Sequence, residues 1–174
     1  MALSNSTTRN VNVLDRMLSE RRPLVMGILN VTPDSFSDGG RFIDPQAALA
    51  HARQMIAEGA DVIDAGAEST RPYTGARPVS ADEEIARLAP VLRLLAEVGT
   101  PVSIDTIKAK VAAWALEQGA VILNDVWGLQ RDLDMAHIAA EHGVPVIVMH
   151  NRERPDPALD IVADIDAFFR RSLE

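Results

Sequence analysis

Residues 24–40 read LVMGILNVTPDSFSDGG, a nearly unbroken apolar run that leads into Asn30 and then into a loop rich in Ser, Asp and Gly. A run of this kind is typical of a strand that is buried on both faces of a parallel sheet. Four further runs follow, so strands are expected at residues 24–29, 62–63, 102–104, 121–123 and 144–149. The sequence therefore predicts five parallel strands.

Alanine-rich amphipathic stretches separate these runs and predict helices at residues 45–58, 81–98, 108–118 and 133–142. A last helix is expected from about Asp160 onward. The four inner helices end near glycines that fit left-handed C-caps, namely Gly59, Gly99, Gly119 and Gly143. Two helix starts carry N-cap signals: Asp44 precedes a proline, and Ser80 is followed by Glu83 in a capping box. Strands that alternate with helices indicate an α/β fold.

The composition limits the class of protein. The chain has 174 residues, of which 47% are hydrophobic and 24% charged, as in a single globular domain. Its formal net charge of −8 argues against a nucleic-acid partner, because such proteins normally present a basic face. The chain contains no cysteine, which excludes disulfide scaffolds, thiolate zinc sites and cysteine nucleophiles.

No secretory signal is recognisable in residues 1–10, and no apolar run approaches the roughly 20 residues that span a bilayer. We therefore expect a cytoplasmic protein without a membrane partner. Residues 1–22 lie outside the repeat and are expected to form an N-terminal tail or short hairpin, whereas residues 23–174 form one domain. Five strand–helix units suit a doubly wound sheet, whereas a (β/α)8 barrel needs three more units and about 250 residues.

Polar residues follow every predicted strand. They are Asn30 after the first, Glu68 after the second, Asp105 after the third, Asn124 after the fourth and His150 after the fifth. Because reactive groups gather at the carboxyl ends of parallel strands, these side chains are expected to share one rim. Asp105 and Asn124 directly follow buried runs, where an unpaired polar group is costly, so they indicate a site. Asp125 alone is better explained as a turn or capping residue.

The stretch from Gly27 to Gly40 closely resembles the first signature of the dihydropteroate synthase family. Residues 68–72, Glu-Ser-Thr-Arg-Pro, match the family's second signature. The strand ends Ser103-Ile104-Asp105-Thr106, Asn124-Asp125 and Met149-His150 match the third, fourth and fifth, in the same order. The resemblance covers nearly everything from Leu24 onward and implies a (β/α)8 TIM-barrel fold, here an incomplete barrel of about five parallel strand–helix units.

The resemblance also implies an activity. The family condenses 6-hydroxymethyl-7,8-dihydropterin diphosphate with 4-aminobenzoate in folate biosynthesis, giving 7,8-dihydropteroate and diphosphate. Magnesium assists, sulfonamides compete with 4-aminobenzoate, and the family enzymes are homodimers. Carried onto this sequence, Asp105 and Asn124 are the expected catalytic and pterin-binding residues, with Asp105 ionised, and Met149 also contacts substrate. Asn30 is expected to bind Mg²⁺ and substrate, and Thr70 and Arg71 to bind 4-aminobenzoate and diphosphate.

The sequence departs from the family in three ways. Ala67 stands where a glycine is usual, and the loop after Pro72 is a few residues longer. More seriously, the family's later motifs, Asp-Pro-Gly-Phe-Gly, Ser-Arg-Lys and an arginine–histidine pair, do not occur, and neither do its dimer helices. We therefore expect the isolated chain to be inactive, with open edges and exposed apolar surface at the first and fifth strands. It would be a fragment of a longer product, or would pair with a partner that completes the barrel.

Three alternatives remain open at this stage. A methyltetrahydrofolate:corrinoid methyltransferase shares the barrel and its Asp/Asn grip on pterin, but lacks the loop of residues 31–40. A truncated paralogue could bind pterin or a full-length partner without catalysis. A flavodoxin-like module would follow from the strand count alone.

Overall fold

The computed structural model describes residues 17–32, 44–68 and 78–174. It contains five strands, β1 (Met26–Asn30), β2 (Val62–Gly66), β3 (Val102–Asp105), β4 (Ile122–Asp125) and β5 (Val146–Val148). The helices between and after them are α2 (Pro45–Ala57), α3 (Ala81–Leu95), α4 (Ala109–Glu117), α5 (Asp134–His142) and α6 (Ile161–Leu173). Every predicted strand and helix is present, with ends that differ by a few residues.

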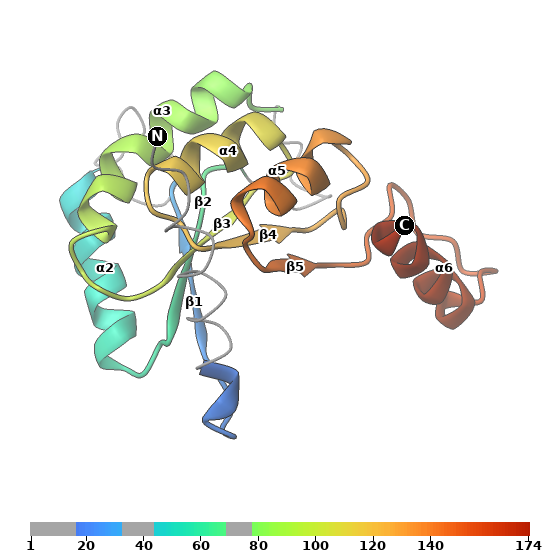
Figure 1. The fold of residues 1–174 in the computed structure, drawn as a ribbon, viewed down its shortest axis with the longest axis horizontal. Helices are drawn as coiled ribbons and strands as arrows, with labels where there is room; N and C mark the ends of the chain where they lie inside the picture. Colours follow the sequence, from blue (N-terminus) through green and yellow to red (C-terminus); the bar gives the residue numbers. More distant parts are fainter. Residues whose placement is uncertain (1–16, 33–43, 69–77) are drawn as a thin grey trace.

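The strands form one parallel sheet in the order β1-β2-β3-β4-β5. Helices α2 to α5 lie side by side along one face of this sheet, and α6 stands beyond β5 (Figure 1). A doubly wound sheet reverses its strand order and carries helices on both faces. The unreversed order with helices along one face is that of a barrel wall, so the flavodoxin-like alternative is wrong.

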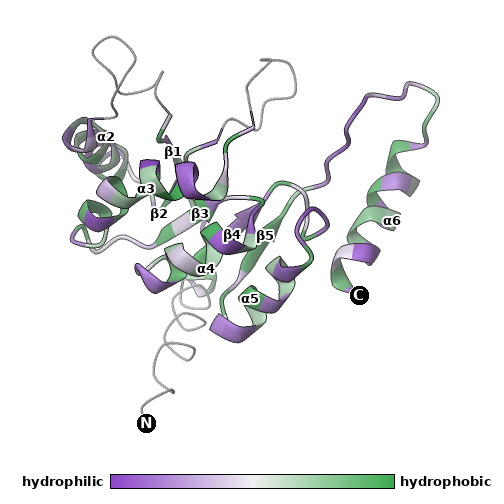
Figure 2. Ribbon diagram, turned by 90° about the horizontal axis from the view of Figure 1, so that it is seen from above, coloured by the Kyte–Doolittle hydropathy of each residue, from purple (hydrophilic) through white to green (hydrophobic). Residues whose placement is uncertain are grey.

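Alternation along the strands separates the two faces of the sheet. Leu29, Ile63, Ile104 and Leu123 point to the helices and form the main core with residues such as Leu88 and Val111. The opposite face, called the inner face below, is the one that a closed barrel would enclose. At its lower end Met17, Val62 and Ile122 form a smaller apolar cluster. The hydropathy colouring shows hydrophobic and hydrophilic residues alternating along the helices, as expected of helices that pack one side against the sheet (Figure 2).

The predicted helix caps are confirmed. The Asp44 side chain accepts a hydrogen bond from the Gln46 amide, and the Ser80 hydroxyl accepts one from the Glu83 amide. Asp160 caps α6 in the same way, at the predicted start. All four glycines expected after helices have positive φ angles: Gly59, Gly99, Gly119 and Gly143. These local signals fix where the chain turns back toward the sheet.

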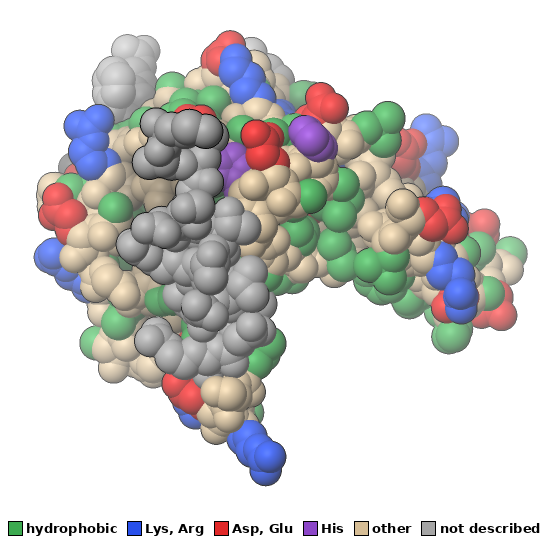
Figure 3. Space-filling view, viewed as in Figure 1, with side chains coloured by type: hydrophobic (Ala, Val, Ile, Leu, Met, Phe, Trp, Pro, Cys, Tyr) green, Lys and Arg blue, Asp and Glu red, His purple; other side chains and the backbone are tan. Residues whose placement is uncertain are grey.

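The edges of the sheet are exposed, as predicted. Ile28 on β1 is 60% exposed, and Ile147 on β5 is 40% exposed. Hydrophobic side chains gather along the β5 side of the molecule, toward α6 (Figure 3). The expectation that all five strands are buried on both faces is therefore wrong for β1 and β5. Their inner faces lack the opposing wall that a closed barrel supplies.

Candidate functional site at the carboxyl ends of the strands

One row of the inner face collects the predicted site residues. The strand register aligns Asn30 with Gly66, Gly66 with Asp105, Asp105 with Asn124, and Asn124 with Ile147. Three of the expected residues, on three different strands, thus lie at one level near the carboxyl ends. They belong to the strands themselves, because each strand runs one or more residues further than the apolar pattern indicated. Their side chains therefore have the fixed direction that the pleat imposes.

Asp105 occupies the centre of this row. Its Oδ1 atom is buried and has no hydrogen-bond partner among the described residues. Burial, reinforced by the nearby negative charges of Asp64, Glu84 and other acids, raises the pKa of Asp105 to about 7. The carboxyl group is therefore about half protonated at neutral pH in the unliganded chain, and the ionised Asp105 expected beside a bound pterin stays a prediction.

Gly66 leaves the space that Asp105 uses. A Cβ atom at position 66 would lie 3.2 Å from the Cβ atom of Asp105 and 3.4 Å from its Oδ2 atom. Such contacts are tight enough that the aspartate would have to move. A glycine at this point of β2 therefore lets the carboxyl group of the neighbouring strand turn across the row.

Asn124 is held by an aspartate that the sequence interpretation did not select. The Asn124 Nδ2 atom donates to Asp64 Oδ2 at 2.9 Å. Asp64 lies in the middle of β2, is 3% exposed, and burial raises its pKa. The apolar run covers only Val62 and Ile63, so the pattern places Asp64 at the end of the strand and does not select it as a site residue. A strand continued to Gly66 would have revealed a lone carboxylate in a buried run, which is costly without a partner.

Several polar atoms on the inner face lack a partner within the described part of the chain. The clearest is Asp105 Oδ1; Asp64 Oδ1 and Ser103 Oγ also lack a partner with full hydrogen-bond geometry, although the Ser103 hydroxyl interacts with the Asp64 carboxyl group and acts to lower its pKa. Buried polar atoms in folded proteins are almost always hydrogen-bonded, so a group of exceptions on one face marks a place for a ligand or for water. Two of the three belong to carboxyl groups. The complementary molecule is therefore rich in hydrogen-bond donors.

A second polar cluster lies near the row and is formed by Lys108, Glu84 and Glu68. Lys108, at the start of α4, donates to Glu84 Oε2 at 2.6 Å and also pairs with Glu68. Burial acts to lower the pKa of Lys108, but the hydrogen bonds to both carboxylates outweigh it and raise that pKa. The other oxygen of Glu68 accepts from the Val79 amide at 2.9 Å, and Arg87 donates to the Ala67 carbonyl.

This cluster joins the two ends of the segment between β2 and α3. Glu68 precedes that segment and Val79 follows it, so their hydrogen bond closes its base. Thr70 and Arg71 lie within it, outside the described residues. Their predicted binding to 4-aminobenzoate and diphosphate stays a prediction.

Asp125 is a turn residue, as expected. Its two carboxylate oxygens accept from the Trp127 and Leu129 amides, each at 2.8 Å, and the side chain is 1% exposed. Met149 follows β5, is 44% exposed, and its amide donates to the Asp125 carbonyl at 3.2 Å. Its predicted contact with substrate is not tested by these contacts.

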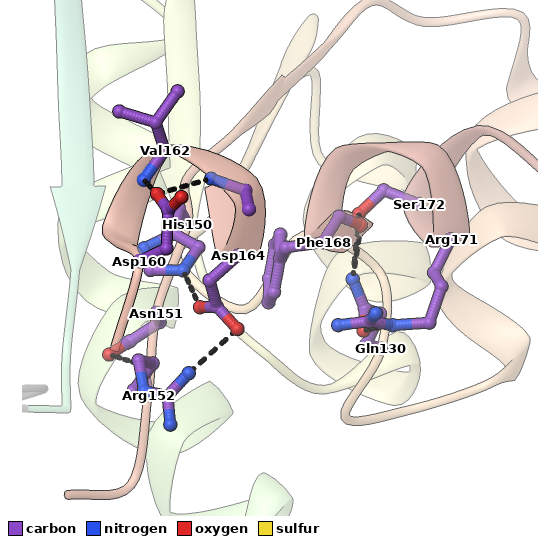
Figure 4. A network of polar contacts seen from close by, with 11 residues as sticks. Gln130, His150, Asn151, Arg152, Asp160, Val162, Asp164, Phe168, Arg171 and Ser172 are labelled. Carbon is purple, nitrogen blue, oxygen red and sulfur yellow. Dashed lines mark hydrogen bonds and ion pairs between the residues drawn. The ribbon is translucent and has the colours of Figure 1, made fainter. Parts of the chain in front are cut away.

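His150 lies in an anchoring network for α6. Its Nε2 atom is 2.7 Å from Asp164 Oδ2, and Arg152 pairs with the other oxygen of Asp164 at 2.7 Å (Figure 4). The His150 ring also packs edge-on against Phe168, with 5.0 Å between the ring centroids. Hydrogen bonds from Gln130 to Phe168 and Ser172 extend the network. These contacts explain His150 structurally.

The predicted magnesium ligand, Asn30, is exposed at the carboxyl end of β1. Within residues 17–32, 44–68 and 78–174, no group of three or more His, Cys, Asp or Glu residues is arranged to hold a metal ion. Those same residues include no helix that is long and apolar enough to cross a membrane. Asn30 can supply one oxygen to an ion whose other ligands come with a substrate, which fits the preference of Mg²⁺ for phosphates and water.

The fold and the row of polar residues define a class of protein. It is a parallel (β/α) barrel wall that carries, at the carboxyl ends of its strands, a site whose acceptor atoms suit a ligand with hydrogen-bond donors. Residues 26–174 match the family described as pterin binding enzyme. The chain therefore belongs to the pterin-binding enzyme family.

Relatives of this chain within the family include dihydropteroate synthases. Over 134 residues the chain is 56% identical to the dihydropteroate synthase of Bacillus subtilis, which covers 76% of this chain and 46% of that protein. It is 53% identical over 136 residues to the Clostridium beijerinckii enzyme, covering 78% of this chain and 50% of that protein. The chain thus spans about half the length of these relatives.

Solved structures agree in fold. A dihydropteroate synthase from Clostridium difficile, crystallised in the presence of pteroic acid, superimposes with a TM-score of 0.82 at 46% identity. It covers 88% of this chain and 58% of that one. The Xanthomonas albilineans enzyme with 4-aminobenzoic acid gives a TM-score of 0.79 at 42% identity, covering 88% of this chain and 55% of that one. The expectation of an incomplete TIM barrel is thereby confirmed.

Proposed function

We propose that this chain carries the pterin-binding wall of a dihydropteroate synthase. The activity is the condensation of 6-hydroxymethyl-7,8-dihydropterin diphosphate with 4-aminobenzoate in folate biosynthesis. The observation that carries the proposal is the row formed by Asp105 and Asn124, with Asp64 behind them, in which buried acceptor atoms lack partners. Relatives and solved structures named dihydropteroate synthase support it. They give no support to the methyltransferase alternative.

The chemistry of the row suits a pterin. The ring presents an exocyclic amino group and ring N–H groups on one edge, and these donors match carboxylate and amide oxygens in a dry pocket. In the reaction, the bond between the methylene carbon and the diphosphate oxygen breaks, and the nitrogen of the aniline forms the new bond to that carbon. Positive charge that develops on the pterin is stabilised by Asp105 once it is ionised.

The raised pKa of Asp105 gives this step a pH dependence. With a pKa of about 7 in the unliganded chain, the carboxyl group must lose a proton to bind as the anion. Pterin donors hydrogen-bonded to the carboxylate favour its charged form and lower the pKa. Affinity for the pterin should therefore rise between about pH 6 and pH 8 and then level off.

Asn30 is proposed to contribute one oxygen ligand to a magnesium ion that arrives with the diphosphate. A bound Mg²⁺ would neutralise charge on the leaving diphosphate. Thr70 and Arg71 are proposed to bind 4-aminobenzoate and diphosphate, and Met149 to contact the pterin. A cytoplasmic location and assembly as a homodimer also belong to this proposal.

The isolated chain is proposed to bind pterin but not to turn over substrates, since it spans about half of its relatives. Calorimetric titration with 6-hydroxymethyl-7,8-dihydropterin diphosphate and magnesium tests the first part, with Asp105→Ala as the comparison. Binding that disappears in the variant is expected. Equal binding by both proteins contradicts the assignment of Asp105.

A steady-state assay tests the second part. No dihydropteroate should form from the isolated chain, and ordinary turnover contradicts the proposal. A second candidate, a non-catalytic protein that binds pterin or a partner, is favoured by the exposed edges at β1 and β5. Co-purification with an intact synthase, together with pterin binding and no turnover, distinguishes it.

A further inference from the structure

The hydrogen bond between Asp64 and Asn124 joins residues that are two strands apart. Asp64 lies on β2 and Asn124 on β4, with β3 between them. In a flat sheet the two strands would lie about 10 Å apart, since neighbouring strands are about 4.8 Å apart, and Asn124 is also two residues further along than Ile122, which is level with Asp64. Nevertheless the two side chains meet at 2.9 Å. The curvature of the barrel wall turns inner-face side chains toward one another, and this contact depends on it.

The residues between the two partners are small. Ser103 stands opposite Asp64 on β3 and is fully buried. Gly66, two residues beyond Asp64 on the same face, carries no side chain. The route from Asp64 to Asn124 is therefore open, and a larger residue on β3 would block it. Three strands contribute to one contact whose geometry is set by backbone pairing.

The orientation of the Asn124 side-chain amide in this contact affects which ligands the site can bind. An amide side chain has a donor end and an acceptor end, whereas an ionised carboxylate only accepts. Because the Asn124 nitrogen is bonded to Asp64, the Asn124 oxygen is the end left for a ligand. A turned amide would offer its N–H groups instead. Asp64 thus decides whether the site presents an acceptor or a donor at this position.

We propose that Asp64 is a positioning residue, which locks the Asn124 amide so that its oxygen faces the pterin and selects for a ring edge with N–H donors. The proposal rests on the proposed function for its ligand. The orientation of the amide itself is a property of the unliganded chain and can be measured without any ligand.

The first measurement is NMR of the Asn124 side-chain amide in the unsubstituted chain, assigned by its loss in Asn124→Ala. One of its two protons should be shielded from solvent exchange and shifted by the carboxylate, while its twin exchanges freely. Two equivalent, rapidly exchanging protons overturn the proposal. This measurement needs no folded Asp64 variant.

The second measurement compares Asp64→Ala with Asp61→Ala, which removes the same carboxylate three residues earlier on the chain, at a pair with Arg22. In Asp64→Ala no acceptor is left for the Asn124 Nδ2 atom, so its amide should lose its protected proton, and affinity for 6-hydroxymethyl-7,8-dihydropterin should fall about tenfold. Asp61→Ala should leave both unchanged. A fall in affinity with an unaltered Asn124 amide overturns the proposal, because Asp64 would then act on the ligand directly.

The two measurements distinguish a failure of the proposed function from a failure of the positioning role. If the unsubstituted chain does not bind the pterin, the ligand assignment fails, whereas a protected Asn124 proton that depends on Asp64 still supports the positioning role. If the pterin binds and the amide is unprotected, the positioning role alone is wrong.

Discussion

The centre of the sheet and its β5 edge are built in different ways. In the centre, β2 to β4 pair on both sides, and charged groups such as Glu84 and Lys108 are buried or half-buried in contact with one another. At the β5 edge, α6 is held by one buried ring, Phe168, and by partly buried polar contacts, none of which involves a fully buried charge such as Glu84. The candidate site lies in the centre. We infer that the paired strands of the centre position a ligand, whereas the β5 edge is exposed and does not contribute to that positioning.

The largest effect is expected from breaking the central charge cluster. Lys108→Ala would leave Glu84, whose side chain is 1% exposed, and Glu68 without their cation. Removing one member of a buried ion pair costs about 3 to 5 kcal/mol. Because two carboxylates lose the same cation, we expect the free energy of unfolding at pH 7, measured by urea denaturation, to fall by about 5 kcal/mol.

Lys110→Ala is the matched control. Lys110 pairs with Asp82, but their side chains are 64% and 81% exposed. Exposed pairs of this kind contribute about 0.5 kcal/mol or less. Equal losses of stability in the two variants would show that burial of the Lys108 cluster does not matter, contrary to the distinction drawn between centre and surface.

The second effect concerns Asp105 and pH. Its folded pKa of about 7 lies above its ordinary value of 3.8. Between these values the folded chain binds more protons than the unfolded chain, so stability contributed by this group falls as pH rises from about 4 to 7. Asp105→Asn should remove this loss. It should stabilise the chain at pH 8 relative to pH 4, by up to about 4 kcal/mol.

Asp61 is expected to make the stability of the chain depend on pH in the opposite direction. Its pKa is lowered to about 2 by hydrogen bonds from Arg22 and from the Val25 amide. A lowered pKa contributes stability above about pH 4 that is lost as pH falls toward 2. Relative to the unsubstituted chain, the free energy of unfolding measured by denaturation should therefore change with pH between about pH 2 and 4 in Asp61→Asn and between about pH 4 and 7 in Asp105→Asn, with slopes of opposite sign. Slopes of the same sign would contradict the burial of Asp105.

The third effect is expected at Gly128, in the loop after β4, where the chain contacts α6. Gly128 has a φ of +59°, and a Cβ atom there would lie 2.6 Å from Cε1 of Phe168. Gly128→Ala combines backbone strain with displacement of this ring from α6. We expect a loss of about 2 kcal/mol, together with faster amide hydrogen exchange in α6.

Gly99→Ala separates these two causes. Gly99 also has a positive φ, +80°, but an added Cβ atom would meet nothing within 4 Å. Only the backbone cost of about 1 kcal/mol should remain, with exchange in α6 unchanged. If both variants loosen α6 equally, the Phe168 contact is not what holds that helix.

Much of this fold follows from local sequence signals. The Asp44 and Ser80 caps and the glycines after the helices predicted the turns correctly, because each signal acts within a few residues. Strand ends were less accurate because apolar runs report burial, whereas pairing extends strands into polar residues. β2 continues to Gly66 and β3 to Asp105 for this reason.

The shared position of the expected site residues was predicted in part, whereas their roles stay predictions. Asn30, Asp105 and Asn124 were found because they follow apolar runs and match family motifs, and they share one row. Asp64 was missed, since its role depends on a contact across two strands that no local pattern contains. The Lys108 cluster was missed for the same reason: its partners are 24 and 40 residues away. The pKa of Asp105 likewise depends on its burial in the folded chain and, to a smaller extent, on acids from several elements.

The smallest effect is expected from the polar anchor of α6. Asp164→Ala removes the partner of both His150 and Arg152, whereas Asp166→Ala, on the same helix, removes only an exposed pair with Arg170. Because Asp164 joins α6 to the chain after β5, its loss should speed amide hydrogen exchange in α6 several-fold while exchange in β2 to β4 stays unchanged. Asp166→Ala should alter neither. Faster exchange throughout the sheet in Asp164→Ala would mean that α6 unfolds together with the core, and the edge would then be as much a part of the rigid centre as Asp105 and Asn124 are.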